Sequence, residues 1–202
     1  PSIVQAWHLG TQSGYAISEV LYGDYNPSGK LTMSFPRSVG QMPLYYSRKS
    51  TGRPGADGED QGSVFWSHYQ DEKNSPLYPF GYGLSYTSFD YSQITLTDSK
   101  MSPDETINAD ITITNTGKEK GKEVVQMYIH DRYASATRPI RELKGFQIVE
   151  LDPGESKTVT FKIDESLLKF YSGNNRWEAE PGDFDIYIGT NSDTKLKASF
   201  IL

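Results

Sequence analysis

The sequence predicts a mainly β protein, with an antiparallel β-sandwich preceded by the truncated end of an α/β sandwich domain. The first observation is that apolar residues recur at every second position through the C-terminal half of the chain, the period of a strand with one buried face. The second is that turn-forming Asn, Asp, Pro and Gly residues separate these runs. The third is composition: 13% aromatic residues with 18 Gly and 11 Pro favour strands and tight turns over long helices.

Residues 1–46 form the first predicted segment, the C-terminal remnant of an α/β sandwich domain. An apolar run from Ile3 is followed by apolar residues at helical spacing between Ser13 and Tyr22, which predicts one strand and one helix closed by Gly23. Residues 26–29 predict a turn, and residues 30–35 a short strand. A strand covered by a helix normally belongs to a larger parallel sheet, whose other strands are absent here. We therefore interpret the segment as the tail of a larger domain.

Residues 47–88 form the second predicted segment, an interdomain linker rich in Gly, Pro and aromatic residues. The run 51–58 is a loop by composition, and Pro and Gly punctuate the remainder, so little regular structure is expected. A connection of this length without elements of its own is usually a linker or a functional loop. Its aromatic residues indicate that it packs against other parts of the protein.

Residues 89–202 form the third predicted segment, an antiparallel sandwich of about seven short strands. The alternating sets are Ile94 and Leu96; Ile107, Ala109, Ile111 and Ile113; Val125, Met127 and Ile129; Val159, Phe161 and Ile163; Phe184, Ile186 and Ile188; and Leu196, Ala198, Phe200 and Leu202. Leu167 and Leu168 are expected on a short helical turn. This pattern is typical of immunoglobulin-like or fibronectin type III-like domains, and the absence of Cys excludes the disulfide-bearing antibody variety.

Charge and composition exclude several classes of function. With 20 Lys and Arg against 26 Asp and Glu the net charge is -6, which argues against nucleic-acid binding. No apolar run approaches the roughly 20 residues needed to span a bilayer, so no membrane role is expected. Without Cys, the chain has no thiol nucleophile or thiolate metal site.

Three local groups of residues have structural explanations that we prefer to catalytic ones. Asp57, Glu59 and Asp60 lie among Gly residues without a liganding pattern, which favours a solvated loop. His8, His68 and His130 are far apart and lack zinc-binding spacing. The run 10–14 precedes a helix but lacks the third Gly of a dinucleotide fingerprint and the Lys of a P-loop, so it is interpreted as a structural turn. No cofactor and no metal are expected.

Several motifs in collinear order resemble the C-terminal third of family 3 glycoside hydrolases, the β-glucosidase and β-xylosidase group. In the first two segments the motifs are residues 7–14 (WHLGTQSG), 21–31 (LYGDYNPSGKL) and 79–86 (PFGYGLSY). In the third segment they are residues 115–117 (NTG), 121–129 (GKEVVQMYI), 138–146 (RPIRELKGF) and 151–156 (LDPGES). These last motifs resemble the family's fibronectin type III-like domain.

The resemblance implies an exo-acting retaining β-glycosidase, with a β-glucosidase favoured, that hydrolyses terminal non-reducing β-linked sugars. In that family an Asp nucleophile lies on an N-terminal (β/α)8 barrel and a Glu acid/base on the following α/β sandwich, so both would lie outside these 202 residues. Retaining hydrolysis needs two carboxyl groups about 5 to 5.5 Å apart. We therefore expect the chain alone to be inactive, with the two missing domains as its partners and an oligo- or aryl-glycoside as the substrate. A periplasmic or secreted bacterial enzyme is expected, with the cytoplasm left open because no signal is present.

The candidate substrate-binding residues are Trp66, His68, Tyr69 and Asp71, in the region that runs along the domain junction in the family. Sugar rings present flat C–H faces that stack on Trp or Tyr, while Asp and His hydrogen-bond hydroxyl groups. The alternative is that Trp66 and Tyr69 pack the linker against the missing domains. The sequence leaves both open.

A second class of function is an independent carbohydrate-binding or adhesion module. Such modules usually carry aromatic residues on an exposed strand face or cleft. Phe161, Phe184 and Phe200 fall on the apolar alternating face, which places them in the predicted core. This favours a structural role for the sandwich.

Overall fold

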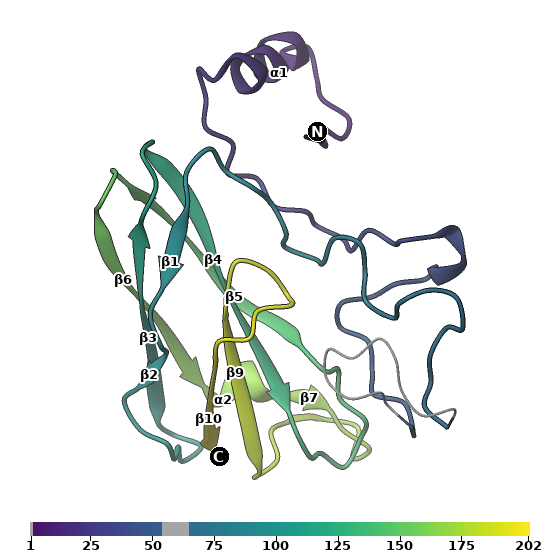
Figure 1. Cartoon of the computed structure of the whole chain (residues 1–202). Helices are drawn as coiled ribbons and strands as arrows, with labels where there is room; N and C mark the ends of the chain where they lie inside the picture. Colours follow the sequence, from purple (N-terminus) through teal and green to yellow (C-terminus); the bar gives the residue numbers. More distant parts are fainter. Residues whose placement is uncertain (1, 54–64) are drawn as a thin grey trace.

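The computed structural model describes residues 2–53 and 65–202. It has two parts, a β-sandwich and a long N-terminal segment that lies beside it (Figure 1). We call the described residues 2–53 and 65–86 the arm. The acidic group Asp57, Glu59 and Asp60 lies outside the described residues.

The arm contains helix α1 (Ser13–Tyr22) and the short 3-10 helix η1 (Val39–Gln41). As predicted, α1 ends at Gly23, whose φ of 85° is the left-handed conformation that favours glycine at a helix end. The predicted strands at the start of the chain and at residues 30–35 are wrong. Residues 3–6 have no regular structure, and of residues 30–35 only Phe35 makes an isolated bridge, to Tyr78. Residues 30–35 bond to residues 77–82 at Leu31 and Phe35, but these backbone hydrogen bonds are too far apart to form a continuous ladder. Among the described residues, no backbone hydrogen bond reaches residues 3–6, so a strand there has no partner.

The sandwich consists of two antiparallel sheets. Strand β3 (Thr106–Asn115) pairs along one edge with β1 (Phe89–Tyr91) and β2 (Thr95–Leu96), and along the other with β6 (Ser156–Asp164). The second sheet has the order β10 (Lys197–Ile201), β9 (Asp183–Gly189), β4 (Gly121–Asp131), β5 (Glu142–Leu151). A hairpin of β7 (Phe170–Tyr171) and β8 (Trp177–Glu178) lies outside both sheets.

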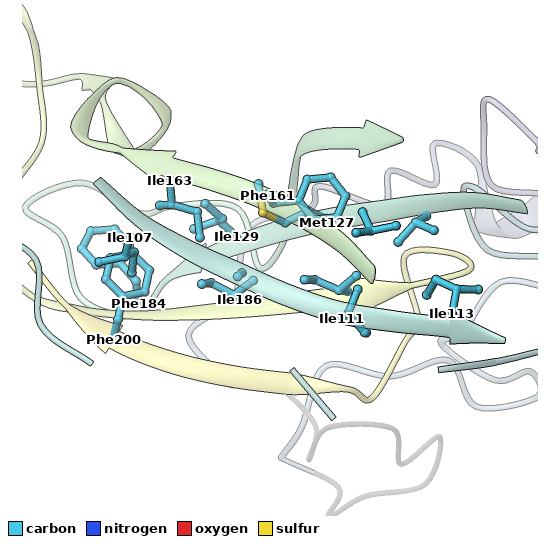
Figure 2. Close-up of a cluster of buried hydrophobic side chains, with 14 of the residues drawn as sticks. Ile107, Ile111, Ile113, Met127, Ile129, Phe161, Ile163, Phe184, Ile186 and Phe200 are labelled. Carbon is cyan, nitrogen blue, oxygen red and sulfur yellow. The ribbon is translucent and has the colours of Figure 1, made fainter. Parts of the chain in front are cut away.

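The hydrophobic core lies between the two sheets (Figure 2). The alternation predicted from the sequence is confirmed on β3, β4, β6 and β9, where every second side chain is buried. Phe161, Phe184 and Phe200 are buried as expected, and Phe184 stacks on Phe200 with ring centroids 5.3 Å apart. The predicted helical turn is also confirmed as α2 (Glu165–Leu168), which Asp164 caps by accepting a hydrogen bond from the Ser166 amide.

Strand β5 was not identified from the sequence. Among the strands of residues 2–53 and 65–202 it pairs with β4 alone, and much of it is exposed. Its apolar pattern does not alternate, because the apolar Phe146 and Ile148 are 61% and 60% exposed and a register shift interrupts the pairing with β4. No helix among residues 2–53 and 65–202 is long and apolar enough to cross a membrane.

Candidate functional site

The four predicted substrate-binding residues lie on one irregular segment of the arm. Trp66 is partly buried, while His68, Tyr69 and Asp71 are exposed. The Nδ1 atom of His68 lies 2.8 Å from the carbonyl oxygen of Trp66, so the ring donates there in its Nδ1–H tautomer. Near the start of the segment, the Ser67 amide donates a hydrogen bond to the carbonyl oxygen of Arg53 at 2.9 Å. The structure thus holds the His68 ring against the Trp66 backbone, while Tyr69 and Asp71 follow along the same exposed segment.

Asn74 closes this segment into a loop. Its Nδ2 atom donates to the carbonyl oxygen of Ser67 at 3.0 Å, and its Oδ1 atom accepts from the amide of Tyr69 at 3.2 Å. A single side-chain amide therefore fixes the backbone on both sides of His68. Short amide and carboxyl side chains commonly stabilise loops by satisfying backbone groups in this way.

The base of the loop is held by Gln41, a fully buried polar side chain at the end of η1. Its Nε2 atom donates to the carbonyl oxygen of Lys73 at 2.6 Å, and its Oε1 atom accepts from the Arg37 amide at 2.5 Å. The Arg37 guanidinium donates to the carbonyl of Ser75 at 3.0 Å. Sequence reasoning missed both Gln41 and Asn74, because a single Gln or Asn in a loop has no periodic or spacing signal.

The arm is joined to the outer face of the second sheet by aromatic and amide contacts. Tyr46 stacks on Phe80 with centroids 4.2 Å apart, and its ring meets that of Tyr128 on β4 edge-on at 6.0 Å. Gln126, also on β4, donates from Nε2 to the carbonyl of Gly81 at 3.1 Å. Tyr128 and Gln126 are both buried, so these contacts are shielded from water.

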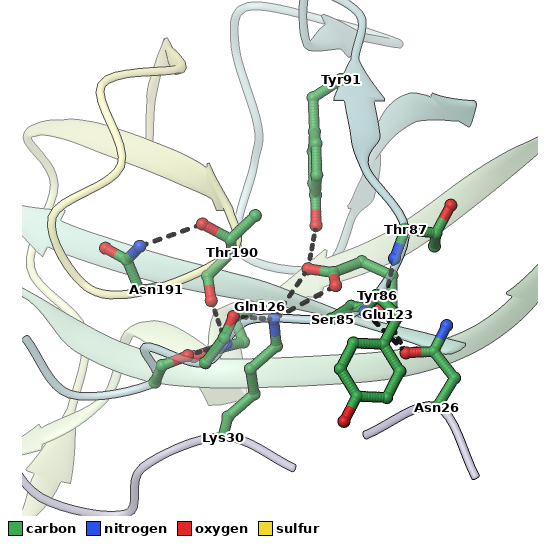
Figure 3. A network of polar contacts seen from close by, with 12 residues as sticks. Asn26, Lys30, Ser85, Tyr86, Thr87, Tyr91, Glu123, Gln126, Thr190 and Asn191 are labelled. Atoms are coloured by element: carbon green, nitrogen blue, oxygen red, sulfur yellow. Dashed lines mark hydrogen bonds and ion pairs between the residues drawn. The ribbon is translucent and has the colours of Figure 1, made fainter. Parts of the chain in front are cut away.

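A buried ion pair makes a second joint between the arm and the sandwich (Figure 3). The Nζ atom of Lys30 lies 3.1 Å from Glu123 Oε2 and also donates to the carbonyl of Gly83 at 3.2 Å. Tyr91 donates its hydroxyl to Glu123 Oε1 at 2.9 Å. Burial, and then the negative charge of Glu123, raise the pKa of Tyr91 far above its usual value, so its phenol remains a donor.

Asn26 extends this joint on the side of α1. Its Nδ2 atom donates to the carbonyl of Lys120, and its Oδ1 atom accepts from the Ser85 hydroxyl and the Tyr86 amide, each at 2.8 Å (Figure 3). The motif residues that carried the resemblance, Asn26, Lys30, Gly81 and Gly83, are thus the residues that attach the arm. Their spacing in the sequence gave no sign that they meet.

The loop carries an indole, an imidazole, a phenol and a carboxylate. Aromatic rings can stack on C–H faces, and the polar groups can form hydrogen bonds with hydroxyl groups. Among residues 2–53 and 65–202, no group of three or more His, Cys, Asp or Glu side chains is arranged to hold a metal ion.

The fold and the arm place the protein in the class of fibronectin type III-like β-sandwiches that carry an N-terminal extension. Comparison with protein families matches residues 123–192 to the fibronectin type III-like domain and residues 1–86 to the glycosyl hydrolase family 3 C-terminal domain. The chain belongs to glycosyl hydrolase family 3 and corresponds to its C-terminal part.

Individual relatives match almost the whole chain. It is 50% identical over 201 residues to a periplasmic beta-glucosidase of Salmonella typhimurium, covering 100% of this chain and 26% of that protein. It is 43% identical over 192 residues to a beta-xylosidase of Formosa agariphila, covering 95% of this chain and 25% of that protein. The crystal structure of a beta-glucosidase from Listeria innocua in complex with glucose superimposes with a TM-score of 0.91 at 40% identity, covering 98% of this chain and 27% of that one. The chain therefore spans about a quarter of the length of these relatives.

Proposed function

We propose that this chain is the C-terminal structural part of an exo-acting retaining β-glycosidase that removes terminal non-reducing β-linked sugars, and that glucose is the preferred sugar. The observation that carries the proposal is the match of both halves of the chain, in order, to relatives named beta-glucosidase and beta-xylosidase. The buried joints between arm and sandwich support a role in bracing the adjoining domains.

Under this proposal the chain has three functional segments. Residues 1–46 are the end of the α/β sandwich domain, residues 47–88 are the linker, and residues 89–202 are the fibronectin type III-like domain. The N-terminal (β/α)8 barrel and the α/β sandwich domain are its partners within one enzyme. The exposed apolar side chains of the arm, which include Ile3, Tyr15 and Leu21, support this arrangement because a larger domain would cover them.

We further propose that Trp66, His68, Tyr69 and Asp71 contact the leaving-group sugar. Support comes from the loop that Asn74 and Gln41 hold in one conformation, since a preordered loop lowers the entropy lost on binding. A periplasmic location is proposed from the name of the Salmonella typhimurium relative.

Activity assays test the proposal directly. The 202-residue chain and the complete product of its gene are purified side by side and assayed on aryl β-glucosides and aryl β-xylosides. We expect turnover by the complete product, faster on the glucoside, and none by the 202-residue chain. Circular dichroism of the chain serves as the control that it is folded.

Two results would contradict the proposal. Turnover by the 202-residue chain, in a preparation shown to be free of host glycosidases, would place a complete active site within it. Immunoblotting of the source organism could also detect a complete gene product of 22.7 kDa, the mass of these 202 residues. That result would favour a binding or scaffolding protein over an enzyme.

A further inference from the structure

The hairpin of β7 and β8 presents two aromatic rings to solvent on one face. Tyr171 and Trp177 are directly opposite each other in the hairpin register and are 58% and 67% exposed. Their rings meet edge to face, with centroids 6.0 Å apart and an interplanar angle of 68°. Such a contact occupies at most one face of one ring, so most of both rings is accessible.

The opposite face of the hairpin is anchored in the protein. Because side chains alternate along a strand, Phe170 points away from the exposed pair, and it is buried with the Arg138 guanidinium 4.5 Å above its ring. Glu178 accepts hydrogen bonds from Asn174 Nδ2 at 2.9 Å and Arg176 Nε at 2.6 Å. It also accepts one from the Ser172 hydroxyl. The rings therefore lie on a rigid support.

These carboxylate contacts persist over a wide pH range. Hydrogen bonds from Ser172, Asn174 and Arg176 lower the pKa of Glu178 to about 2. The carboxylate therefore remains an acceptor for these three hydrogen bonds at neutral and mildly acidic pH. A platform that is already ordered loses little conformational entropy when a ligand binds.

The size and surroundings of the aromatic pair indicate what binds there. A stable protein interface buries about 800 Å² on each partner, whereas two side chains of this kind offer only about 150 to 250 Å² each. Exposed Asn174, Asn175 and Arg176 lie at the adjoining tip and supply hydrogen-bonding groups. Flat rings with amide and guanidinium groups beside them match one or two sugar units.

We propose that Tyr171 and Trp177 form a platform that binds a neutral β-linked oligosaccharide by stacking on its sugar rings. β-Linked glucose and xylose units keep their ring substituents equatorial and present flat C–H faces, which an aromatic ring covers well. The choice of β-linked sugars rests on the proposed function, while the platform itself rests on the hairpin. Neither residue was a candidate from the sequence.

Titration of the 202-residue chain by NMR tests the platform. Its three Trp residues give three indole N–H signals, assigned with Trp7→Phe, Trp66→Phe and Trp177→Phe variants. We expect cellohexaose or xylohexaose to shift the Trp177 signal in a saturable manner, and α-linked maltohexaose to shift it much less. Because these variants lack the Trp177 indole, their binding is followed by the backbone amide signals of the hairpin. Trp177→Ala should weaken binding about fivefold or more, while Trp177→Phe retains part of the affinity.

Tyr133→Ala is the matched control, because Tyr133 is a similarly exposed aromatic residue, at 76%, outside the hairpin. It should leave the affinity unchanged. Should Trp177→Ala fail to fold, Tyr171→Ala provides the same comparison. No saturable shift at Trp177 with either β-linked hexaose, or equal shifts with maltohexaose, would overturn the proposal. The titration measures binding and not hydrolysis. A negative result would therefore contradict the platform without contradicting the glycosidase proposal, which the activity assays test.

Discussion

Lys30 and Glu123 show how much one pair of residues contributes to the joint between arm and sandwich. Their side chains are only 11% and 3% exposed, and their charged atoms lie 3.1 Å apart. A buried charge that loses its partner is costly because it has left water without compensation. Tyr91 and the Gly83 carbonyl complete the hydrogen bonding of this pair. Replacing one member of the pair should therefore lower the free energy of unfolding by more than the lost contact area suggests.

We predict that Lys30→Met lowers the free energy of unfolding by about 3 kcal/mol, because Glu123 is left buried without a cation. Urea unfolding followed by circular dichroism measures the change. Lys120→Met is the matched control, since Lys120 pairs with Glu150 at 2.8 Å on the surface and such pairs contribute little. Equal effects of the two variants would show that the Lys30 pair is no more important than a surface pair.

Trp66→Ala distinguishes the two roles left open for the candidate loop. If Trp66 stacks on the leaving-group sugar, the variant of the complete enzyme should have a several-fold higher KM for longer glycosides and an unchanged Tm. Steady-state kinetics and a thermal melt provide the two readouts. Tyr45→Ala, which removes another exposed aromatic residue of the arm, is the control. A lower Tm with an unchanged KM would identify Trp66 as a packing residue.

At the scale of elements, the turn at Gly81 connects the arm to β4. Its φ of 80° is favourable only for glycine. A Cβ atom there would lie 2.1 Å from Gln126 Oε1, the side chain that binds the Gly81 carbonyl. The left-handed backbone conformation and the close approach of the Gln126 side chain therefore both favour glycine at position 81.

We predict that Gly81→Ala destabilises the chain by about 3 kcal/mol or more, measured by urea unfolding. Gly154→Ala separates the two causes, because Gly154 has nearly the same φ, 79°, with open space around its Cα. That variant should cost about 1 to 2 kcal/mol, the price of the left-handed conformation alone. If Gly81→Ala costs no more than Gly154→Ala, the contact with Gln126 is not a constraint.

Elements could be predicted from the sequence where the apolar pattern of the segment matched the side chains that face the core, or where the segment carried its own stop signal. Helix α1 and strands β3, β4, β6 and β9 follow this rule, because each has one face on the core or a helical stop signal of its own. Residues 3–6 have an equally apolar pattern, yet they form no strand in the absence of a pairing partner. Strand β5 was missed for a different reason, because its apolar residues Phe146 and Ile148 are exposed and its pairing with β4 has a register shift.

At the scale of the whole molecule, Asp185 links stability to pH. Burial by itself raises its pKa, but hydrogen bonds from Arg132 and Ser199 and the charge of Lys197 outweigh burial and leave the pKa below its usual value. The Arg132 contacts are bidentate, at 2.9 and 2.5 Å. The unfolded chain therefore binds this proton more readily, at a pKa of about 3.9. The stabilisation is complete above that pH and is lost as the pH falls through the lower folded value.

We predict that the urea midpoint of the wild-type chain falls between about pH 5 and pH 2, and that Asp185→Asn, less stable at pH 7, approaches the wild type across this range. Urea titrations at several pH values measure this narrowing. Asp193→Asn is the control, since Asp193 forms an exposed pair with Lys195. A constant difference between Asp185→Asn and the wild type from pH 7 to pH 2 would contradict the assignment.

The β-sandwich, the buried faces of β3, β4, β6 and β9, helix α1 and the family could be read from the sequence, because periodicity, turn residues and collinear motifs are local properties of the chain. The buried residues Val149 and Leu151 of β5 could not. The tertiary structure alone decided which distant residues meet. Lys30 reaches Glu123 across 93 positions, Asn74 fixes the candidate loop, and Tyr171 and Trp177 stand together on a hairpin of two short strands. Such contacts depend on where the backbone returns after a long loop. A single polar or aromatic residue has no periodic sequence pattern from which its distant partner could be predicted.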